Sequence, residues 1–184
     1  LKQRFYLEAD QWDGVPQFKS NFVDNVMSQF GVISIGGDIH SSYVTEHKPN
    51  AVTGKRSFNF TTSSVSSGTF GSFLENGMNQ IFSQLGDVPD ALSDLPFYFD
   101  PLVRTATKRD DITDDMVFSR MWEHGVAIVE LDADELLVNF HNVGSEFHNV
   151  DSTSRSYYDR PDDFLAMVRL YKFRIANGVL EQLD

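Results

Sequence analysis

The chain has 184 residues, of which 41% are hydrophobic and 13% aromatic, so it can build the core of one domain and is not a disordered chain. Its formal net charge of −12 argues against a nucleic-acid-binding surface, because binding to phosphate backbones requires clustered Lys and Arg. The absence of cysteine excludes disulfides and thiolate metal sites, and no apolar run is long enough for a membrane span.

The first segment, LKQRFYLEADQWDG, has neither an initiating Met nor an apolar signal core, so we expect the chain to be part of a longer protein. After it, the spacing of the apolar residues predicts a helix over residues 16–30. The next segment, GVISIGG, is rich in β-branched residues and predicts a buried strand with a sharp exit at its glycines. In such an α/β unit, ligands bind beyond the carboxyl end of the strand.

Further along the chain, Phe58 and Phe60 alternate with polar residues, which predicts a strand. The Ser/Thr/Gly loop that follows is too polar to be expected in the core. Apolar residues at helical spacing then predict an amphipathic helix from Phe70 to Leu85, interrupted at Gly77. Residues 86–115 carry prolines and acids and predict a long irregular connection, of the kind that often has a function or meets a partner.

The remaining sequence predicts antiparallel hairpins. Residues 125–143 form two apolar runs joined at DADE, and residues 168–183 form two more joined at Asn177 and Gly178, a strong signal for a two-residue turn. The fold class predicted from this order is α/β (α+β), ending in antiparallel hairpins. No internal repeat divides the chain, so we expect residues 1–184 to form a single unit.

Asp38 and His40, in the motif GGDIH, are the leading candidates for chemistry. A carboxylate and an imidazole with one residue between them at a strand end can point to the same side and reach a shared metal or phosphate. Alternatively, Asp38 caps the turn and His40 is a polar residue with ordinary hydrogen bonds. The residues alone leave both interpretations open.

Other polar clusters carry weaker signals. His-Asn pairs recur in FHNVGSEFHNV and would suit hard or borderline cations, but their spacing is no established ligand pattern, which favours an exposed polar loop. The members of these pairs are His141, Asn142, His148 and Asn149. The acidic runs DDITDDM and DADE lack the EF-hand pattern, and the common serine-hydrolase, dinucleotide and P-loop motifs are absent. His47 and His124 stand alone and support no site.

Several of these segments together resemble one family. DQWDGVP is followed by a helix, then by ISIGGDIHSSY, FNFTTSSVSSG and MWEHGVAIVELDADELLVNF. In order and spacing, from Asp10 to the final hairpins, they are similar to the carboxyl-terminal half of PhoD-like alkaline phosphatases and phosphodiesterases. The most specific part of the resemblance is D-x-W-D-G followed by G-D-x-H-S-S.

The resemblance implies a calcineurin-like metallophosphoesterase fold, with layered β-sheets, flanking helices and a metal centre at strand ends. It implies hydrolysis of phosphate mono- or diesters by a metal-activated water, with iron and calcium as the metals, in a periplasmic or extracellular protein. The PhoD-like motif has Asp where the wider superfamily has a first His, and Asp38 matches that position. His40 is then a metal ligand, and Asp38 is a second ligand or the group that orients it.

The early metal-binding motifs of this family precede D-x-W-D-G, and residues 1–9 cannot contain them. The resemblance therefore implies that the amino-terminal half of the enzyme is a partner of this segment, which alone is expected to be inactive. A non-catalytic binding or structural module that keeps the scaffold is the alternative. The intact Asp38 and His40 favour the hydrolase.

Overall fold

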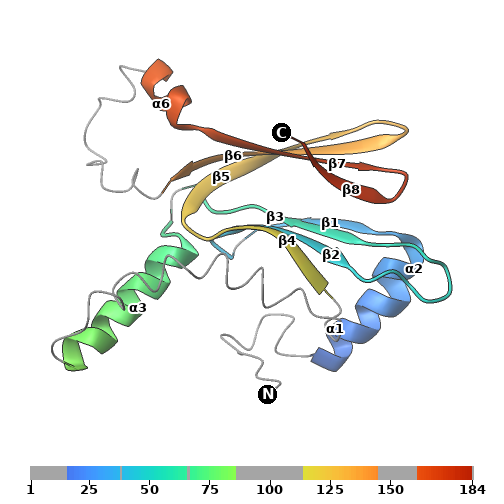
Figure 1. Cartoon of the computed structure of the whole chain (residues 1–184), viewed down its shortest axis with the longest axis horizontal. Helices are drawn as coiled ribbons and strands as arrows, with labels where there is room; N and C mark the ends of the chain where they lie inside the picture. The colour runs from blue at the N-terminus through green and yellow to red at the C-terminus, as the bar shows by residue number, and fades with distance from the viewer. Residues whose placement is uncertain (1–15, 38, 66, 86–113, 145–160, 184) are drawn as a thin grey trace.

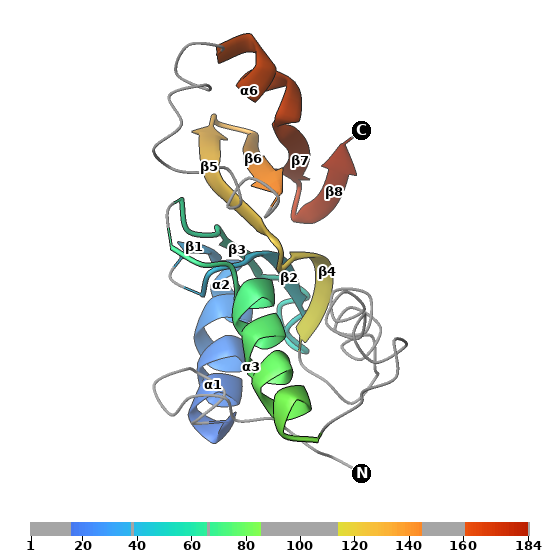
Figure 2. The ribbon, with the colours of Figure 1, turned by 90° about the vertical axis from the view of Figure 1, so that its left-hand side faces the viewer.

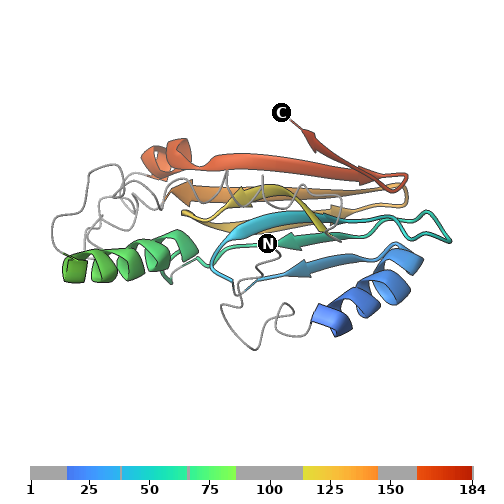
Figure 3. The ribbon, with the colours of Figure 1, turned by 60° about the horizontal axis from the view of Figure 1, so that its bottom comes forward.

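The computed structural model describes residues 16–37, 39–65, 67–85, 114–144 and 161–183. These residues form two four-stranded β-sheets that lie face to face (Figure 1). The strands of both sheets run roughly along the same line (Figure 3). The structure is therefore α+β with layered sheets and antiparallel hairpins at the carboxyl end, which confirms the predicted fold class.

The two sheets differ in how they follow the chain. Sheet A has the order β1 (Ile33–Gly36), β3 (Phe58–Thr61), β2 (Ser42–His47) and β4 (Asp114–Arg120). In sheet A, β1 and β3 are parallel and the other neighbours are antiparallel. Sheet B is antiparallel throughout and keeps the chain order β5 (Glu123–Leu131), β6 (Glu135–Gly144), β7 (Arg169–Ala176) and β8 (Val179–Leu183).

The predicted first helix is present and runs from Pro16 to Phe30. It consists of α1 (Pro16–Phe22), a π-helical turn η2 (Val23–Met27) and α2 (Ser28–Phe30). It ends at Gly31, whose φ of 69° is left-handed and is adopted most easily by glycine. Figure 2 shows this helix and α3 (Phe70–Leu85) on the side of sheet A away from sheet B.

The predicted strand after this helix exists as β1, but the expectation that it is buried is wrong. β1 pairs with β3 alone among the described strands, and Ile35 is 54% exposed. Its apolar, β-branched sequence suits a strand covered on both faces, whereas the described residues leave much of it uncovered.

The core lies between the two sheets and is mainly aromatic. Phe140 of β6 packs against Phe60 and Phe118 of sheet A, with ring centroids 6.4 Å and 5.7 Å away, and against Phe173 of β7 at 5.8 Å. All four rings are at most 2% exposed. Strands β3 and β6 place these rings on one face by the period of two that the sequence predicted.

Both predicted hairpins are confirmed. Asn177 and Gly178, with φ of 53° and 73°, form the two-residue turn between β7 and β8. Between β5 and β6 the carboxylate of Asp132 accepts hydrogen bonds from the backbone N–H groups of Asp134 and Glu135, and these bonds lower the pKa of Asp132.

Three details of the helices and strands differ from the sequence analysis. Helix α3 is continuous through Gly77, because one glycine weakens a helix without breaking it. Strand β4 begins at Asp114, inside a run expected to be irregular, and α6 (Pro161–Met167) was not predicted. Residues 86–113 lie outside the described part of the chain. No described helix combines the length and the apolar character needed to cross a bilayer.

Candidate active site

His40 lies in the short connection between β1 and β2, beyond the carboxyl end of β1 as predicted. Its φ of 58° places it in the left-handed region, which is costly for a residue with a Cβ atom. Glycine would avoid that cost, so the presence of an imidazole here suggests a role for the side chain. Asp38 lies outside the described residues, and its predicted place beside His40 stays a prediction.

The imidazole of His40 is held by two serines of the loop that follows β3. Its Nδ1 lies 2.9 Å from Ser67 Oγ and 3.4 Å from Ser64 Oγ. Ser64 Oγ donates its own hydrogen to the carbonyl oxygen of Ser67 at 3.0 Å, so toward His40 it can only accept. Ser67 Oγ, the closer of the two, can donate to Nδ1 or accept from it, so the contacts fix the orientation of the ring and are compatible with either tautomer.

This loop, residues 62–69 without Ser66, is called the serine loop below. It was expected to be too polar for the core, but two of its residues, Ser63 and Thr69, are buried, at 5% and 0% exposure. Gly125 N and His124 Nδ1 both donate to the carbonyl oxygen of Ser64, at 3.3 Å and 3.2 Å. The start of β5 therefore anchors the loop that contacts His40.

The amino end of α3 closes the site from another side. Phe70 N donates to the carbonyl oxygen of His40 at 2.9 Å, and Gly71 N donates to that of Met121 at 2.8 Å. Ser72 N is capped by Thr69 Oγ1 at 3.2 Å. The ring of Phe73 lies edge-on to His40, with centroids 5.3 Å apart. The first N–H groups of this helix are thus used within the chain, and they fix the backbone of His40.

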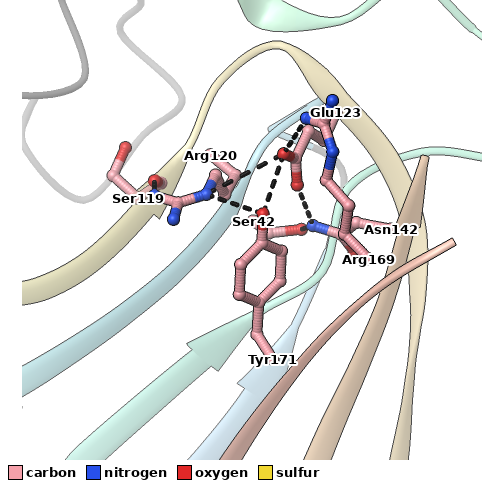
Figure 4. A network of polar contacts seen from close by, with 7 residues as sticks. All are labelled: Ser42, Ser119, Arg120, Glu123, Asn142, Arg169 and Tyr171. Atoms are coloured by element: carbon pink, nitrogen blue, oxygen red, sulfur yellow. Dashed lines mark hydrogen bonds and ion pairs between the residues drawn. The ribbon is translucent and has the colours of Figure 1, made fainter. Parts of the chain in front are cut away.

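A buried polar network joins the two sheets at the start of β5 (Figure 4). The carboxylate of Glu123, a residue only 3% exposed, accepts hydrogen bonds from Arg169 at 2.7 Å, Tyr171 at 3.0 Å and Asn142 at 3.1 Å. Asn142 Nδ2 also donates to Ser42 Oγ at 3.2 Å. We call Ser42, Ser119, Arg120, Glu123, Asn142, Arg169 and Tyr171 the inter-sheet network.

The network balances its buried carboxylate with cations. Arg120 Nε lies 3.8 Å from the Glu123 carboxylate and donates to the Tyr171 hydroxyl at 3.0 Å, while its guanidinium covers the Tyr171 ring. Burial raises the pKa of Tyr171, and the nearby charge of Glu123 acts in the same direction while Arg120 opposes it. Burial and the charge of Glu123 together keep the Tyr171 phenol protonated, so its hydroxyl donates a hydrogen bond to the carboxylate.

Several polar residues are placed differently from the sequence analysis. Asn142 was expected in an exposed loop, but it lies in β6 and is fully buried, because it follows Phe140 on the inward face of the strand. His141 points to the opposite face, while His148 and Asn149 lie outside the described residues. His124 is buried against the serine loop and was missed.

Sequence reasoning also missed Glu123 and the serines that contact His40. The inward alternation of β6 could have indicated Asn142, whereas nothing local marks Glu123 or Ser64 as neighbours of the site. Within the described residues, no three side chains of His, Asp or Glu are grouped closely enough to hold a metal ion.

The family model for PhoD-like phosphatases matches residues 1–100, which is more than half of the chain. The chain belongs to the PhoD-like phosphatase family. This membership confirms the resemblance and supports a phosphoesterase-type, hydrolytic function at the level of the family. Comparisons with curated proteins and with solved structures gave no match.

The PhoD-like match includes His40 and the serine loop but stops before β4. The similarity that the sequence analysis extended to the final hairpins is not covered by it. Sheet B and its share of the inter-sheet network lie beyond the matched residues.

Proposed function

We propose that this chain forms part of the active site of a metal-dependent phosphoric ester hydrolase, in which His40 is a metal ligand. The observation that carries the proposal is the held imidazole of His40. Its backbone is in a left-handed conformation, and two serines engage Nδ1. With the hydrogen on Nδ1, Nε2 would carry the lone pair that binds a metal. Ligating histidines usually donate the other ring N–H to a neighbouring oxygen in this way.

The donor chemistry fits the metals that the family resemblance implies. An imidazole suits iron, and a carboxylate from Asp38 would make the site harder and suit calcium as well. When bound, the metals supply Lewis acidity toward the phosphoryl oxygens and activate water as the nucleophile. His40 and Asp38 would hold them, and Ser64 and Ser67 keep the His40 ring in one orientation.

The remaining ligands are proposed to come from the amino-terminal half of the enzyme. One His and one Asp supply too few donors, since calcium takes about six to eight oxygen ligands. The edge of β1 supports this proposal, because Ile35 is 54% exposed on a strand with one described neighbour. The periplasmic or extracellular location belongs to the same proposal.

The strained backbone at His40 weighs against the alternative of a purely structural module. In such a module glycine would serve the turn at lower cost, and the two serine contacts to the ring would have no purpose. We therefore retain the hydrolase as the better-supported function.

The test is His40→Ala in the whole enzyme, meaning a form that includes the family's amino-terminal motifs. Turnover of nitrophenyl phosphates should fall at least ~100-fold and bound metal should decrease, because one ligand is lost. His141→Ala is the matched control, since His141 lies on the sheet face turned away from the core. Full activity and full metal content in His40→Ala would refute the proposal.

A second experiment tests the division of the site. Residues 1–184 alone should bind iron and calcium poorly and hydrolyse bis-nitrophenyl phosphate slowly, and adding the amino-terminal half in trans should restore both. Turnover by residues 1–184 equal to that of the reconstituted pair would contradict the proposal and would place a complete site in this segment.

A further inference from the structure

The orientation of His40 depends on the position of the serine loop. Ser64 Oγ and Ser67 Oγ contact the ring, but neither serine lies in a strand or helix that would hold it in place. The loop is instead held at Ser63 and Ser64 by residues from other strands. Ser63 N donates to Ser42 Oγ at 3.3 Å, and the carbonyl oxygen of Ser64 accepts from Gly125 N at 3.3 Å.

Ser42, in β2 of sheet A, links this loop to Asn142 of sheet B. Its hydroxyl oxygen accepts from Ser63 N of the loop and from Asn142 Nδ2 of β6. Ser42 is also only two residues from His40 and is fully buried. A displacement of Ser42 would therefore move the connection between β1 and β2, which carries His40. It would also move the serine loop, whose hydroxyls contact the His40 ring.

The carboxylate of Glu123 selects one orientation of the Asn142 amide. Its Nδ2 lies 3.1 Å from the Glu123 carboxylate, while its Oδ1 faces Gly125, where a Cβ atom would lie only 2.0 Å from it. A flipped amide would place an oxygen against the carboxylate, which accepts hydrogen bonds but cannot donate them. The charge of Glu123 thus fixes which end of Asn142 faces Ser42.

We propose that Glu123 and Asn142 are positioning residues, which hold Ser42 and the serine loop so that the His40 ring keeps its contacts through Nδ1. The chain of contacts runs from sheet B, beyond the part of the chain that matches the family model, to the ring of His40. The effect on the ring follows from the geometry alone, whereas the effect on catalysis rests on the proposed function.

The variants that test this are Glu123→Gln and Ser42→Ala. Glutamine keeps the shape of Glu123 but offers an NH₂ group as well as an oxygen, so it no longer dictates the orientation of Asn142. Alanine at position 42 removes the oxygen that joins Asn142 to Ser63. If Glu123→Gln fails to fold, Ser42→Ala still tests the same contact.

Each variant has a matched control. Glu181→Gln removes another carboxylate of sheet B that is paired with an arginine, Arg174 at 2.6 Å, but lies on the exposed surface. Ser28→Ala removes another fully buried serine hydroxyl, one that bonds to Lys48 O and Ser57 Oγ. Both controls reproduce the loss of a polar group without touching the serine loop.

The primary measurement is nitrogen-15 NMR of the His40 ring in the metal-free whole enzyme under mildly alkaline conditions. The His40 signal is assigned from its absence in His40→Ala. The wild-type ring and both controls should give the same pair of ring-nitrogen shifts. Glu123→Gln and Ser42→Ala should give shifted or broadened ring signals, because Nδ1 loses its serine contacts, while urea unfolding shows that they remain folded. Wild-type ring signals in both folded variants would overturn the proposal.

Kinetics of the whole enzyme add a second measurement. Glu123→Gln and Ser42→Ala should lower kcat on nitrophenyl phosphates about 10-fold and change KM less than about twofold, because a displaced ligand mainly affects the chemical step. A loss of activity with an unchanged His40 ring would also overturn the proposal. If the ring changes as expected but His40→Ala stays active, positioning stands and the proposed function fails.

Discussion

Sheet B follows the chain, with β5, β6, β7 and β8 pairing in sequence order, whereas sheet A has the order β1-β3-β2-β4 and takes its last strand from beyond residue 113. Sheet B can therefore form from two local hairpins and their contact, at a small cost in loop closure. Sheet A needs pairings between segments far apart in the sequence. The difference predicts that sheet B depends less on the rest of the chain than sheet A does.

The candidate active site does not belong to sheet A alone, although His40 and the serine loop lie on it. The loop is anchored by Gly125 and His124 of β5, and Ser42 is bonded to Asn142 of β6. Sheet B thus supports the candidate active site, although the residues of that site lie on sheet A. The predictions below test how strongly the two sheets depend on each other.

The largest effect is expected from Phe140→Ala, which removes the ring that touches both sheets. Loss of this fully buried ring should lower the free energy of unfolding by about 3–5 kcal/mol. Urea unfolding followed by circular dichroism and by fluorescence should still show one transition. Phe30→Ala, at a position 65% exposed, should change the stability little. Two separate transitions in Phe140→Ala would mean that sheet B folds independently.

Gly125→Ala tests the junction of the sheets at the start of β5. The added Cβ would lie 2.0 Å from Asn142 Oδ1 and 2.8 Å from the backbone oxygen of His141, so the strand or the amide must move. We expect a loss of about 1–3 kcal/mol in the free energy of unfolding, measured in urea.

The control for this change is Gly77→Ala in α3, where a Cβ would meet no atom within 4 Å. This variant should be more stable than the wild type by about 0.5–1 kcal/mol, because alanine favours a helix. Equal effects of the two alanines would contradict the close contact between β5 and Asn142.

Tyr171→Phe tests the polar contact between the sheets through its dependence on pH. The variant loses the hydrogen bonds that the Tyr171 hydroxyl makes to Glu123 and Arg120, which should cost about 1–2 kcal/mol near neutral pH. The pKa of Tyr171 is raised above its ordinary 10.0, so its stabilising effect is complete below pH 10.0 and is lost as the pH rises through the folded-state pKa.

The measurement is the thermal midpoint of wild type and Tyr171→Phe at a series of pH values from neutral upward. The wild type should lose its advantage over the variant only above pH 10.0. An advantage that is lost at a lower pH would contradict the raised pKa of this phenol.

The smallest effect is expected at the two non-glycine residues with left-handed backbone, one beside each sheet. His40→Gly should be more stable than His40→Ala by about 1 kcal/mol, because alanine keeps the strain and glycine removes it. Asn177→Gly and Asn177→Ala, in the hairpin of sheet B, should differ by a similar amount. Equal urea midpoints of the two His40 variants would show that the connection relaxes and that this backbone stores no strain.

The local elements of this protein were determined by its sequence. The helix from Pro16 to Phe30, the strand around Phe58 and the Asn177–Gly178 hairpin follow from periodicity and turn chemistry, which act over a few residues. The position of His40 beyond the end of β1 follows in the same way, because a strand and its exit are neighbours in the chain.

The tertiary structure decided the contacts between segments that are distant in the sequence. The sequence could not show that β1 is half exposed, that an acidic run contributes β4, or that Asn142 is buried. Nor could it show that Glu123, far from His40 in the chain, is linked to it through Asn142 and Ser42. Such links depend on which faces of the two sheets meet, and that is set by packing over the whole core rather than by local propensity.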